Sequence, residues 1–427
     1  MRLRISAALC LVVFFLFRVP EACASSFPVR ALTHPPGYHW FGYYDKFQFD
    51  PTDRYVLGMQ VSFEHRSPKP EDTVKIGMVD LQEDDKWIEL GKSRAWCWQQ
   101  GCMLQWLPGS RDTILWNDRE GDRFVCRVLN VFTGKLRTIA YPIYTVSPNG
   151  RWALSVDFRR INRLRPGYGY AGPPDPYEKD PAPKNSGIYL VDLKSGSAKL
   201  IVSIARAAAI PSKQNTKGAT HYFNHLLFNP TGDRFVFLHR WRLPGKRGFL
   251  TRMLTSDLTG SDIRVIDDNG GMSHFIWRDS KHILGWAHLP NRGWGFFLFP
   301  DGPGPVVQIG KGILTKNGHV SYLPDKNWLL NDTYPQGKKR EQIVYLYHIP
   351  TKRKIILGRF PSPPAYRGEW RCDTHPRINR KGTAACIDSP HGGNGRQMYL
   401  IDIRQAIGIK EPIGAKEAID TREALKR

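Results

Sequence analysis

The chain has 427 residues, of which 41% are hydrophobic, 12% aromatic and 24% charged, and this balance excludes a disordered protein. Its 39 glycines and 32 prolines argue against a helical bundle and favour many short strands joined by turns. The formal net charge of +23 indicates an anionic partner, with solubility alone as the alternative explanation of the charge.

The first 24 residues have the pattern of an export signal. Arg2 and Arg4 precede a mostly apolar run over residues 5–17, and residues 22–24 (Ala-Cys-Ala) offer a cleavage site. An uncleaved membrane anchor is the alternative, but the run is short of the roughly 20 residues that a spanning helix needs, and Arg18 ends it. We therefore expect an exported protein, periplasmic or secreted, without stable membrane insertion after cleavage.

The distribution of charge bears on the class of partner. Lysines and arginines are scattered along the chain, and no helix-turn-helix or zinc-finger pattern is present. An exported protein also rarely meets nucleic acid, so we expect no nucleic-acid partner. An acidic polysaccharide is the anion that fits this compartment best.

Seven copies of one pattern organise the rest of the chain: a short strand, a polar turn and a second, apolar strand. The copies are FQFDPTDRYVLGM from Phe47, LQWLPGSRDTILW from Leu104, YTVSPNGRWALSV from Tyr144, LLFNPTGDRFVFL from Leu226, FIWRDSKHILGWA from Phe275, VSYLPDKNWLLND from Val320 and PRINRKGTAACID from Pro376. A third strand follows each copy, beginning near Ile76, Cys126, Ile188, Arg252, Phe296, Val344 and Met398. A spacing of about 40–57 residues, with one longer gap, is typical of a β-propeller rather than a sandwich.

These copies predict an all-β protein, a single seven-bladed β-propeller over residues 25–403. The longer gap contains a Pro- and Gly-rich stretch, residues 159–187, which we interpret as a loop inserted into the third blade because the strand pattern then resumes. Residues 404–427 form a Lys-, Glu- and Ala-rich tail. The sequence has no Gly-x-Ser-x-Gly motif, which excludes a propeller-capped serine peptidase.

Five cysteines follow residue 24, an odd number without CxxC spacing. The repeat pattern places Cys372 and Cys386 on neighbouring strands, so this pair is the best candidate for a disulfide in an oxidising compartment. Buried free thiols are the alternative.

Four consecutive copies carry a histidine at the same position, five residues before the turn. These are His225, His274, His319 and His375, whereas the first three copies have Lys46, Met103 and Ile143 there. Equivalent positions of a propeller are related by rotation about the central axis, so the four imidazoles should converge at one mouth of a central funnel. A hydrogen bond from each histidine to a neighbouring turn is the alternative, but four in register favour a metal or proton-transfer site.

From His225 onward the sequence resembles the oligogalacturonate lyase family, seven-bladed propellers that cleave acidic pectin fragments by β-elimination. The resemblance runs through HLLFNPTGDRFVFLHRW at His225, RMLTSDLTGSD at Arg252, GGMSHFIWRD at Gly270, GHVSYLPDKNW at Gly318 and THPRINRKG at Thr374. It implies that His274 is the catalytic base and that Arg252 contacts the substrate carboxylate. It also implies a divalent metal, usually manganese in that family, at His319 and His375.

The sequence departs from the family pattern just before the last of these histidines, where the family has Gln and His. Asp373 and Glu369 are the nearest candidates, so we expect two histidines with one or two carboxylates as metal ligands. Such mixed nitrogen and oxygen donors suit manganese, with zinc and calcium as alternatives. Other polar and aromatic side chains are expected to contact the substrate: Lys46, Tyr222, His225, His239, Arg240 and Arg371.

We therefore expect a metal-dependent lyase that acts on acidic oligosaccharides containing 4-linked uronates. In this chemistry a metal and an arginine neutralise the carboxylate, and a neutral histidine removes the C5 proton. The alternative is a non-catalytic propeller, similar to translocation proteins, that binds a protein or an acidic glycan in the same funnel. A propeller glycoside hydrolase would need two facing carboxylates, and the sequence identifies no such pair.

Overall fold

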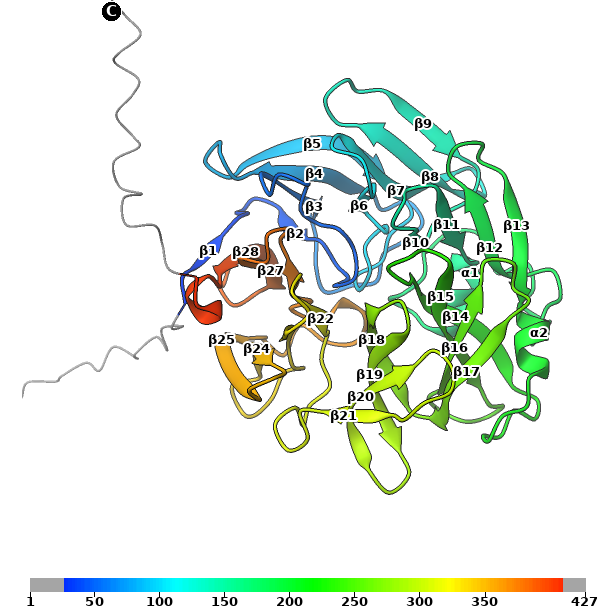
Figure 1. Cartoon of the computed structure of the whole chain (residues 1–427). Helices are drawn as coiled ribbons and strands as arrows, with labels where there is room; N and C mark the ends of the chain where they lie inside the picture. The colour runs from blue at the N-terminus through cyan, green and yellow to red at the C-terminus, as the bar shows by residue number, and fades with distance from the viewer. Residues whose placement is uncertain (1–26, 410–427) are drawn as a thin grey trace, which may run out of the picture.

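The computed structural model describes residues 27–409 and contains seven four-stranded antiparallel sheets. Each sheet stands as one blade around a common centre (Figure 1). This arrangement confirms the prediction of an all-β, seven-bladed propeller. The predicted signal peptide, residues 1–24, and residues 410–427 of the predicted tail lie outside the described residues.

The first three blades follow chain order, with the innermost strand first. They consist of β2 (Tyr38–Trp40), β3 (Tyr55–Val61), β4 (Val74–Asp80) and β5 (Lys86–Ser93); β6 (Gln105–Trp106), β7 (Thr113–Glu120), β8 (Arg123–Asn130) and β9 (Leu136–Ile139); and β10 (Thr145–Val146), β11 (Trp152–Ser155), β12 (Gly187–Asp192) and β13 (Ala198–Ser203).

The next three blades repeat this order. They consist of β14 (Thr220–Phe228), β15 (Arg234–Arg242), β16 (Leu250–Asp257) and β17 (Ile263–Gly270); β18 (Met272–Asp279), β19 (His282–Leu289), β20 (Gly293–Pro300) and β21 (Val307–Ile309); and β22 (Ser321–Tyr322), β23 (Trp328–Asn331), β24 (Glu341–His348) and β25 (Arg353–Pro361).

The seventh blade joins the two ends of the described chain. It contains β26 (Arg377–Ile378), β27 (Ala384–Ser389), β28 (Gln397–Asp402) and, at its outer edge, β1 (Val29–Ala31). β1 pairs antiparallel with β28, with Val29 opposite Ile401, and Figure 1 shows the two strands side by side in blue and red.

Helices are short in this fold. The helical segments are α1 (Phe158–Leu164), α2 (Ile204–Ala209), η1 (Gly368–Trp370) and η2 (Gln405–Ile407). Within residues 27–409, none has the length and apolar character that crossing a bilayer requires.

Irregular inner strands place side chains at the centre of one face. Neighbouring strands of a blade run in opposite directions. The first strand of each blade therefore begins on the same face of the propeller on which the second strand ends and the third strand begins. We call this face the site face. The β14–β15 pairing shifts register over residues 224–227, and the β18–β19 pairing shifts over residues 272–275. These segments contain His225 and His274, and a bulge of this kind redirects a side chain. His225 also has φ +52°, a left-handed conformation uncommon outside glycine.

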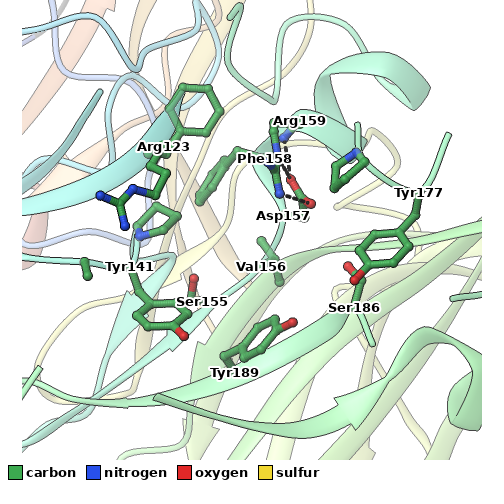
Figure 2. Close-up of a pocket in the computed structure, with 14 residues that line it drawn as sticks. Arg123, Tyr141, Ser155, Val156, Asp157, Phe158, Arg159, Tyr177, Ser186 and Tyr189 are labelled. Atoms are coloured by element: carbon green, nitrogen blue, oxygen red, sulfur yellow. Dashed lines mark hydrogen bonds and ion pairs between the residues drawn. The ribbon is translucent and has the colours of Figure 1, made fainter. Parts of the chain in front are cut away.

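The stretch from 159 to 187 lies between β11 and β12, on the site face, and we call it the insert. It begins in α1, where the Asp157 side chain caps the helix by accepting from the backbone N–H of Arg159. Arg160 is buried, pairs with Asp175 at 3.2 Å and donates to four backbone carbonyls, which holds the insert in one conformation. The insert also forms one wall of a cleft on the outer part of this face (Figure 2).

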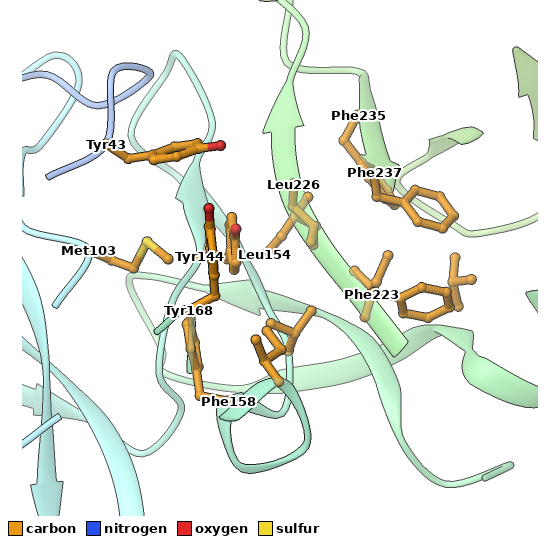
Figure 3. Packing of buried hydrophobic residues seen from close by; sticks show 14 of the residues in the cluster. Tyr43, Met103, Tyr144, Leu154, Phe158, Tyr168, Phe223, Leu226, Phe235 and Phe237 are labelled. Atoms are coloured by element: carbon orange, nitrogen blue, oxygen red, sulfur yellow. The ribbon is translucent and has the colours of Figure 1, made fainter. Parts of the chain in front are cut away.

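A hydrophobic cluster joins the insert to the blades. Phe158 of α1 stacks on Tyr170 with ring centroids 4.3 Å apart, and on Tyr144 at 5.8 Å. Figure 3 shows part of this cluster, including Tyr43, Tyr144 and Tyr168. Because full burial of one aromatic ring stabilises a fold by about 2–3 kcal/mol, these contacts fix the insert to the propeller.

The five described cysteines are all free and buried. The predicted disulfide between Cys372 and Cys386 is therefore wrong. Cys386 lies on β27, where its partner in the ladder is Arg377, whereas Cys372 lies in the loop before β26. Arg377 Nη2 donates to the Cys386 sulfur at 3.6 Å. Burial raises the pKa of both thiols, which keeps them in the unreactive protonated form.

Candidate active site

The structure brings the four predicted histidines together at the centre of the site face. The rings of His274 and His319 have centroids 4.2 Å apart, and the rings of His319 and His375 are equally close. Tyr43 lies among them, stacked on His225 at 5.0 Å and 5.3 Å from His375. We call these five residues the histidine cluster. None of them is more than 6% exposed. Side chains therefore fill the centre of the site face, where the sequence predicted a funnel.

Three side chains present candidate ligand atoms to one another. Ligand atoms of His319, Asp373 and His375 all lie within 4.8 Å of one another, and His375 Nε2 is 4.0 Å from Asp373 Oδ2. Both histidine Nε2 atoms are buried and have no hydrogen-bond partner within residues 27–409. A buried polar atom without a protein partner is costly, so these nitrogens are available to a ligand. Two imidazoles and a carboxylate fit a divalent transition metal that keeps further positions open for substrate.

Asp332 fixes the orientation of one of these imidazoles. Its carboxylate accepts from His319 Nδ1 at 3.0 Å and from the His319 backbone N–H at 2.7 Å. The same carboxylate accepts from the Thr374 hydroxyl and from the backbone N–H of His375, so it ties two blades together. With the proton held on Nδ1, the lone pair of His319 lies on Nε2, as metal binding requires.

His274 has the tautomer of a proton acceptor. Its Nδ1 donates to the Asn317 side-chain oxygen at 3.0 Å, which leaves the lone pair on Nε2, 3.5 Å from the Tyr334 hydroxyl. Burial and neighbouring His319 hold the pKa of His274 well below its usual range. The imidazole is therefore neutral at neutral pH, and its Nε2 keeps a lone pair that can take a proton.

His225 has the opposite tautomer. Gln100 Nε2 lies 3.4 Å from His225 Nδ1 and donates to it, which places the imidazole proton on Nε2, 3.5 Å from the Tyr43 hydroxyl. The backbone N–H of His225 donates to the Tyr144 hydroxyl at 2.8 Å. His225 therefore offers a hydrogen-bond donor to the cluster rather than a lone pair.

A buried arginine and a buried tyrosine next to the cluster have unpaired polar atoms. Arg240 Nη1 and Tyr222 Oη have no hydrogen-bond partner in the described part of the chain. Arg240 Nε donates to Thr251 Oγ1 at 3.1 Å, which fixes the guanidinium group. Burial and neighbouring Arg165 lower the pKa of Arg240 to about 10, so the group stays charged at neutral pH. A buried cation without an anionic partner favours an anionic ligand.

The insert covers the histidine cluster. The Tyr168 ring meets His225 edge-on at 5.7 Å, and the Arg165 guanidinium lies 4.2 Å from the Tyr168 ring centroid. Arg371 Nη2 donates to the Tyr168 hydroxyl at 2.7 Å, and Arg371 Nε donates to Asp373 at 2.6 Å. Arg371 therefore connects the insert to a candidate metal ligand.

Arg252 does not lie in the site, contrary to the prediction. Its Nη atoms donate to the backbone carbonyls of Ala207, Ile210 and Pro211 at 2.7–3.2 Å, so it anchors the end of α2. Arg252 is paired with His239 across the β15–β16 ladder, and successive residues of a strand face opposite sides. The cationic position in the site belongs to the residue after His239, which is Arg240.

His239, predicted to contact the substrate, has both ring nitrogens paired inside the blade instead. His239 is fully buried and accepts from Arg252 Nε at 3.1 Å through Nδ1. Its Nε2 lies 2.9 Å from His221 Nδ1. Both nitrogens of His239 are therefore engaged inside the blade, and burial together with Arg252 holds its pKa well below the usual range.

Two other predicted residues lie nearby with different partners. Glu369 is on η1 and is not one of the three residues whose candidate ligand atoms lie within 4.8 Å of one another, so the structure does not bring it to the predicted metal site; its backbone carbonyl accepts from Gln99 Nε2 at 2.8 Å. Lys46 is buried and pairs with Asp45 at 2.8 Å, with its Nζ 5.5 Å from the Tyr144 ring centroid. The charge of Lys46 is thus already balanced by a neighbouring carboxylate.

Several residues of the site were not found from the sequence. Asp332 had a detectable signal, because an acidic residue ends the apolar second strand in both NWLLND and TAACID. The equivalent Asp388 accepts from the backbone N–H groups of Phe41 and Gly42, next to Tyr43. Tyr168 had no signal, since its place over the cluster depends on how the insert folds back.

The fold and the site define a seven-bladed β-propeller with a buried, histidine-rich centre. No protein-family model matches the sequence, and no curated protein matches it. Among solved structures, an oligogalacturonate lyase from Vibrio parahaemolyticus is similar, with a TM-score of 0.65, 11% identity, and 90% of this chain and 96% of that chain covered.

Two other solved structures show the same architecture. An oligogalacturonate lyase in complex with manganese has a TM-score of 0.64 and 13% identity over 90% of this chain and 96% of that chain. A puromycin-hydrolysing peptidase of Mycobacterium tuberculosis has a TM-score of 0.51 and 11% identity over 88% of this chain and 54% of that chain. Identities this low show a shared propeller fold, which hosts many functions.

Proposed function

We propose that this protein is an exported, metal-dependent lyase that cleaves 4-linked uronate oligosaccharides by β-elimination. One observation carries the proposal: two buried imidazole nitrogens without protein partners lie beside Asp373, and the neutral His274 ring, with its lone pair on Nε2, packs against His319. The first group of side chains suits a metal, and the second suits a general base.

The residues that would hold the metal are His319, Asp373 and His375. A divalent ion bound there would act as a Lewis acid on the substrate carboxylate and so make the adjacent C–H bond more acidic. The mixed nitrogen and oxygen donors suit manganese, which one similar structure contains, with zinc and calcium as alternatives. Asp332 orients His319 for this task through the Nδ1 hydrogen bond.

His274 is the proposed base. Its neutral Nε2 takes the proton from C5 of the uronate, and the electron pair of that C–H bond forms the C4=C5 double bond. The bond between C4 and the glycosidic oxygen breaks, the oxygen leaves with the electron pair of that C4–O bond, and it takes up a proton, so that one proton passes in total from C5, by way of His274, to the leaving oxygen. No water is consumed in this step. Asn317 keeps the proton of His274 on Nδ1, so that the lone pair stays aimed at the substrate side.

Arg240 replaces Arg252 as the proposed contact for the substrate carboxylate. Its charged Nη1 is buried and unpaired, and Tyr222 supplies a hydroxyl that is also without a partner. A carboxylate bound between them would satisfy both groups and draw negative charge away from the reacting carbon. Access to this position requires movement of the insert, because Tyr168 covers the cluster.

The experiment follows the ultraviolet absorbance of the unsaturated uronate product. The purified protein is incubated with a panel of acidic oligosaccharides, with manganese present or removed by a chelator. A rise in absorbance that stops on chelation supports the proposal and identifies the substrate. A flat trace across the panel with metal present, together with measurable glycan binding, would favour a non-catalytic binding propeller instead.

A further inference from the structure

The cleft beside the insert lies on the site face between the second and third blades. It has a volume of about 250 Å³ and is bordered by the outer side of the insert (Figure 2). Six polar or aromatic residues among those that line it are Arg123, Tyr141, Ser155, Tyr177, Ser186 and Tyr189. Phe158 also lines it and stacks on Tyr144 and Tyr170, so aromatic rings separate the cleft from the histidine cluster.

Two hydroxyl groups in the cleft have no protein partner. Ser155 and Ser186 are each only 2% exposed, and neither hydroxyl makes a hydrogen bond within residues 27–409. Both residues line the cleft, so their hydroxyl groups are open to water or to a ligand there rather than engaged by the protein. A ligand that carries hydroxyl groups of its own would satisfy both serines.

The charge of the cleft is positive. Asp157 is the carboxylate that lines it, and Arg159 already neutralises this group through two hydrogen bonds of 2.9 Å. Arg123 is exposed at the start of β8 and has no carboxylate partner in the described chain. One cation is therefore available to an anionic ligand.

Aromatic rings form the remaining walls. The rings of Tyr141 and Tyr189 have centroids 5.9 Å apart and are inclined at 38°. The Tyr189 hydroxyl donates to the Asn185 carbonyl at 2.8 Å, which fixes this ring, and Tyr177 lies on the insert side. Flat apolar walls with a few fixed polar groups are typical of a small-molecule site, and the small volume limits the ligand to a short unit.

We propose that this cleft is an accessory binding site for a uronate unit of an acidic glycan. The carboxylate would pair with Arg123, the sugar hydroxyl groups would bond to Ser155 and Ser186, and the apolar face of the ring would pack on the tyrosines. The class of ligand rests on the proposed function, whereas the site itself does not include any residue of the histidine cluster.

The test measures how much glycan each chain binds. Equilibrium dialysis with trigalacturonate is carried out on the His274→Ala protein, which should bind the ligand without cleaving it, and on the same protein with Arg123→Ala. Two ligands per chain are expected in the first case. Loss of the arginine should weaken one of the two sites about tenfold, as expected for one charge-assisted hydrogen bond. Arg111→Ala is the matched control, because Arg111 is exposed on the same blade at the turn between β6 and β7.

The outcomes separate this proposal from the proposed function. One ligand per chain, removed by Arg123→Ala, would support the cleft and contradict substrate binding at the histidine cluster. Binding that Arg123→Ala leaves unchanged would overturn the accessory site, whatever the lyase assay shows. Equal binding of neutral galactotriose at the Arg123-dependent site would overturn recognition of the acid. Cleavage of trigalacturonate by Arg123→Ala alone, with native His274, should proceed at the original rate at saturating substrate.

Discussion

Asp332 and His319 form a fixed pair at the centre of the propeller, in which one carboxylate accepts both the Nδ1 proton and the backbone N–H of the same histidine. The pair directs the His319 lone pair at Nε2, the atom that lies beside the Asp373 and His375 ligand atoms. In the proposed mechanism Asp332 does not contact the substrate. It is a positioning residue that orients His319 for metal binding.

Asp332→Asn should weaken metal binding by about 10–100-fold, because an amide can offer its N–H to Nδ1 and allow the wrong tautomer. Calorimetric titration with manganese measures the change. The control is Asp325→Asn, on the exposed turn before β23, which should bind manganese as the original protein does. Equal affinity in the Asp332 variant would mean that the carboxylate has no part in holding the metal.

His274→Ala should lower turnover by about 10²–10⁴-fold, because the residue is proposed to take the proton. Manganese affinity should stay unchanged, because His274 is not a proposed metal ligand. The measurement combines the ultraviolet lyase assay with metal titration. Retained turnover would assign the base to another residue, and the Tyr334 hydroxyl, 3.5 Å from His274 Nε2, would be tested next.

The two arginines of the fourth blade should behave differently. Arg252→Met leaves three backbone carbonyls near α2 without a donor and should lower the free energy of unfolding by about 3 kcal/mol. Arg240→Met should instead raise KM for acidic substrate with a smaller effect on stability. Thermal denaturation and steady-state kinetics distinguish the two. A variant of Arg252 that folds as firmly as the original but no longer binds substrate would restore the first assignment.

Tyr168→Ala should open the cover over the histidine cluster. It removes the ring beside His225 and the hydroxyl that Arg371 contacts. We expect turnover of long oligosaccharides to rise relative to short ones, and kcat/KM for a series of chain lengths measures this ratio. Tyr168→Phe, which keeps the ring, is the control. If chain-length preference were the same in all three proteins, the insert would not select substrate length.

His39 should make stability depend on pH. Burial lowers its pKa to about 4, although the hydrogen bond between His39 Nδ1 and the Gln397 side chain acts in the opposite direction. The unfolded chain has the ordinary histidine pKa near 6.5 and binds the proton first, so this stabilisation is complete above pH 6.5 and is lost as pH falls towards 4. The slope approaches about 1.4 kcal/mol per pH unit in that window.

Chemical denaturation of the original protein and of His39→Gln between pH 7 and pH 4 measures this contribution. The variant should lose less stability over the window than the original protein does. His288→Gln, at an exposed position on β19, is the control and should follow the original protein. A parallel loss of stability in all three proteins would assign the acid sensitivity to other groups.

Much of the fold could be predicted because it repeats. Each blade carries its own strand pattern and polar turn, and such local periodicity is visible without knowledge of the rest of the chain. The register of the four histidines was equally accessible, since rotation about the axis converts equal positions in the repeat into neighbouring positions in space. The outer strand of the seventh blade was not predicted, because β1 pairs with β28 across almost the whole sequence.

The sequence by itself therefore determined the propeller, the place of the insert between two strands and the meeting of four histidines. Only the tertiary structure decided which arginine faces them, because Arg240 and His239 differ by one position and successive residues of a strand face opposite sides. It alone brought Asp332 to His319 and laid Tyr168 over His225. These contacts depend on how bulges, loops and the insert pack against residues far away in the chain, and no local pattern encodes that packing.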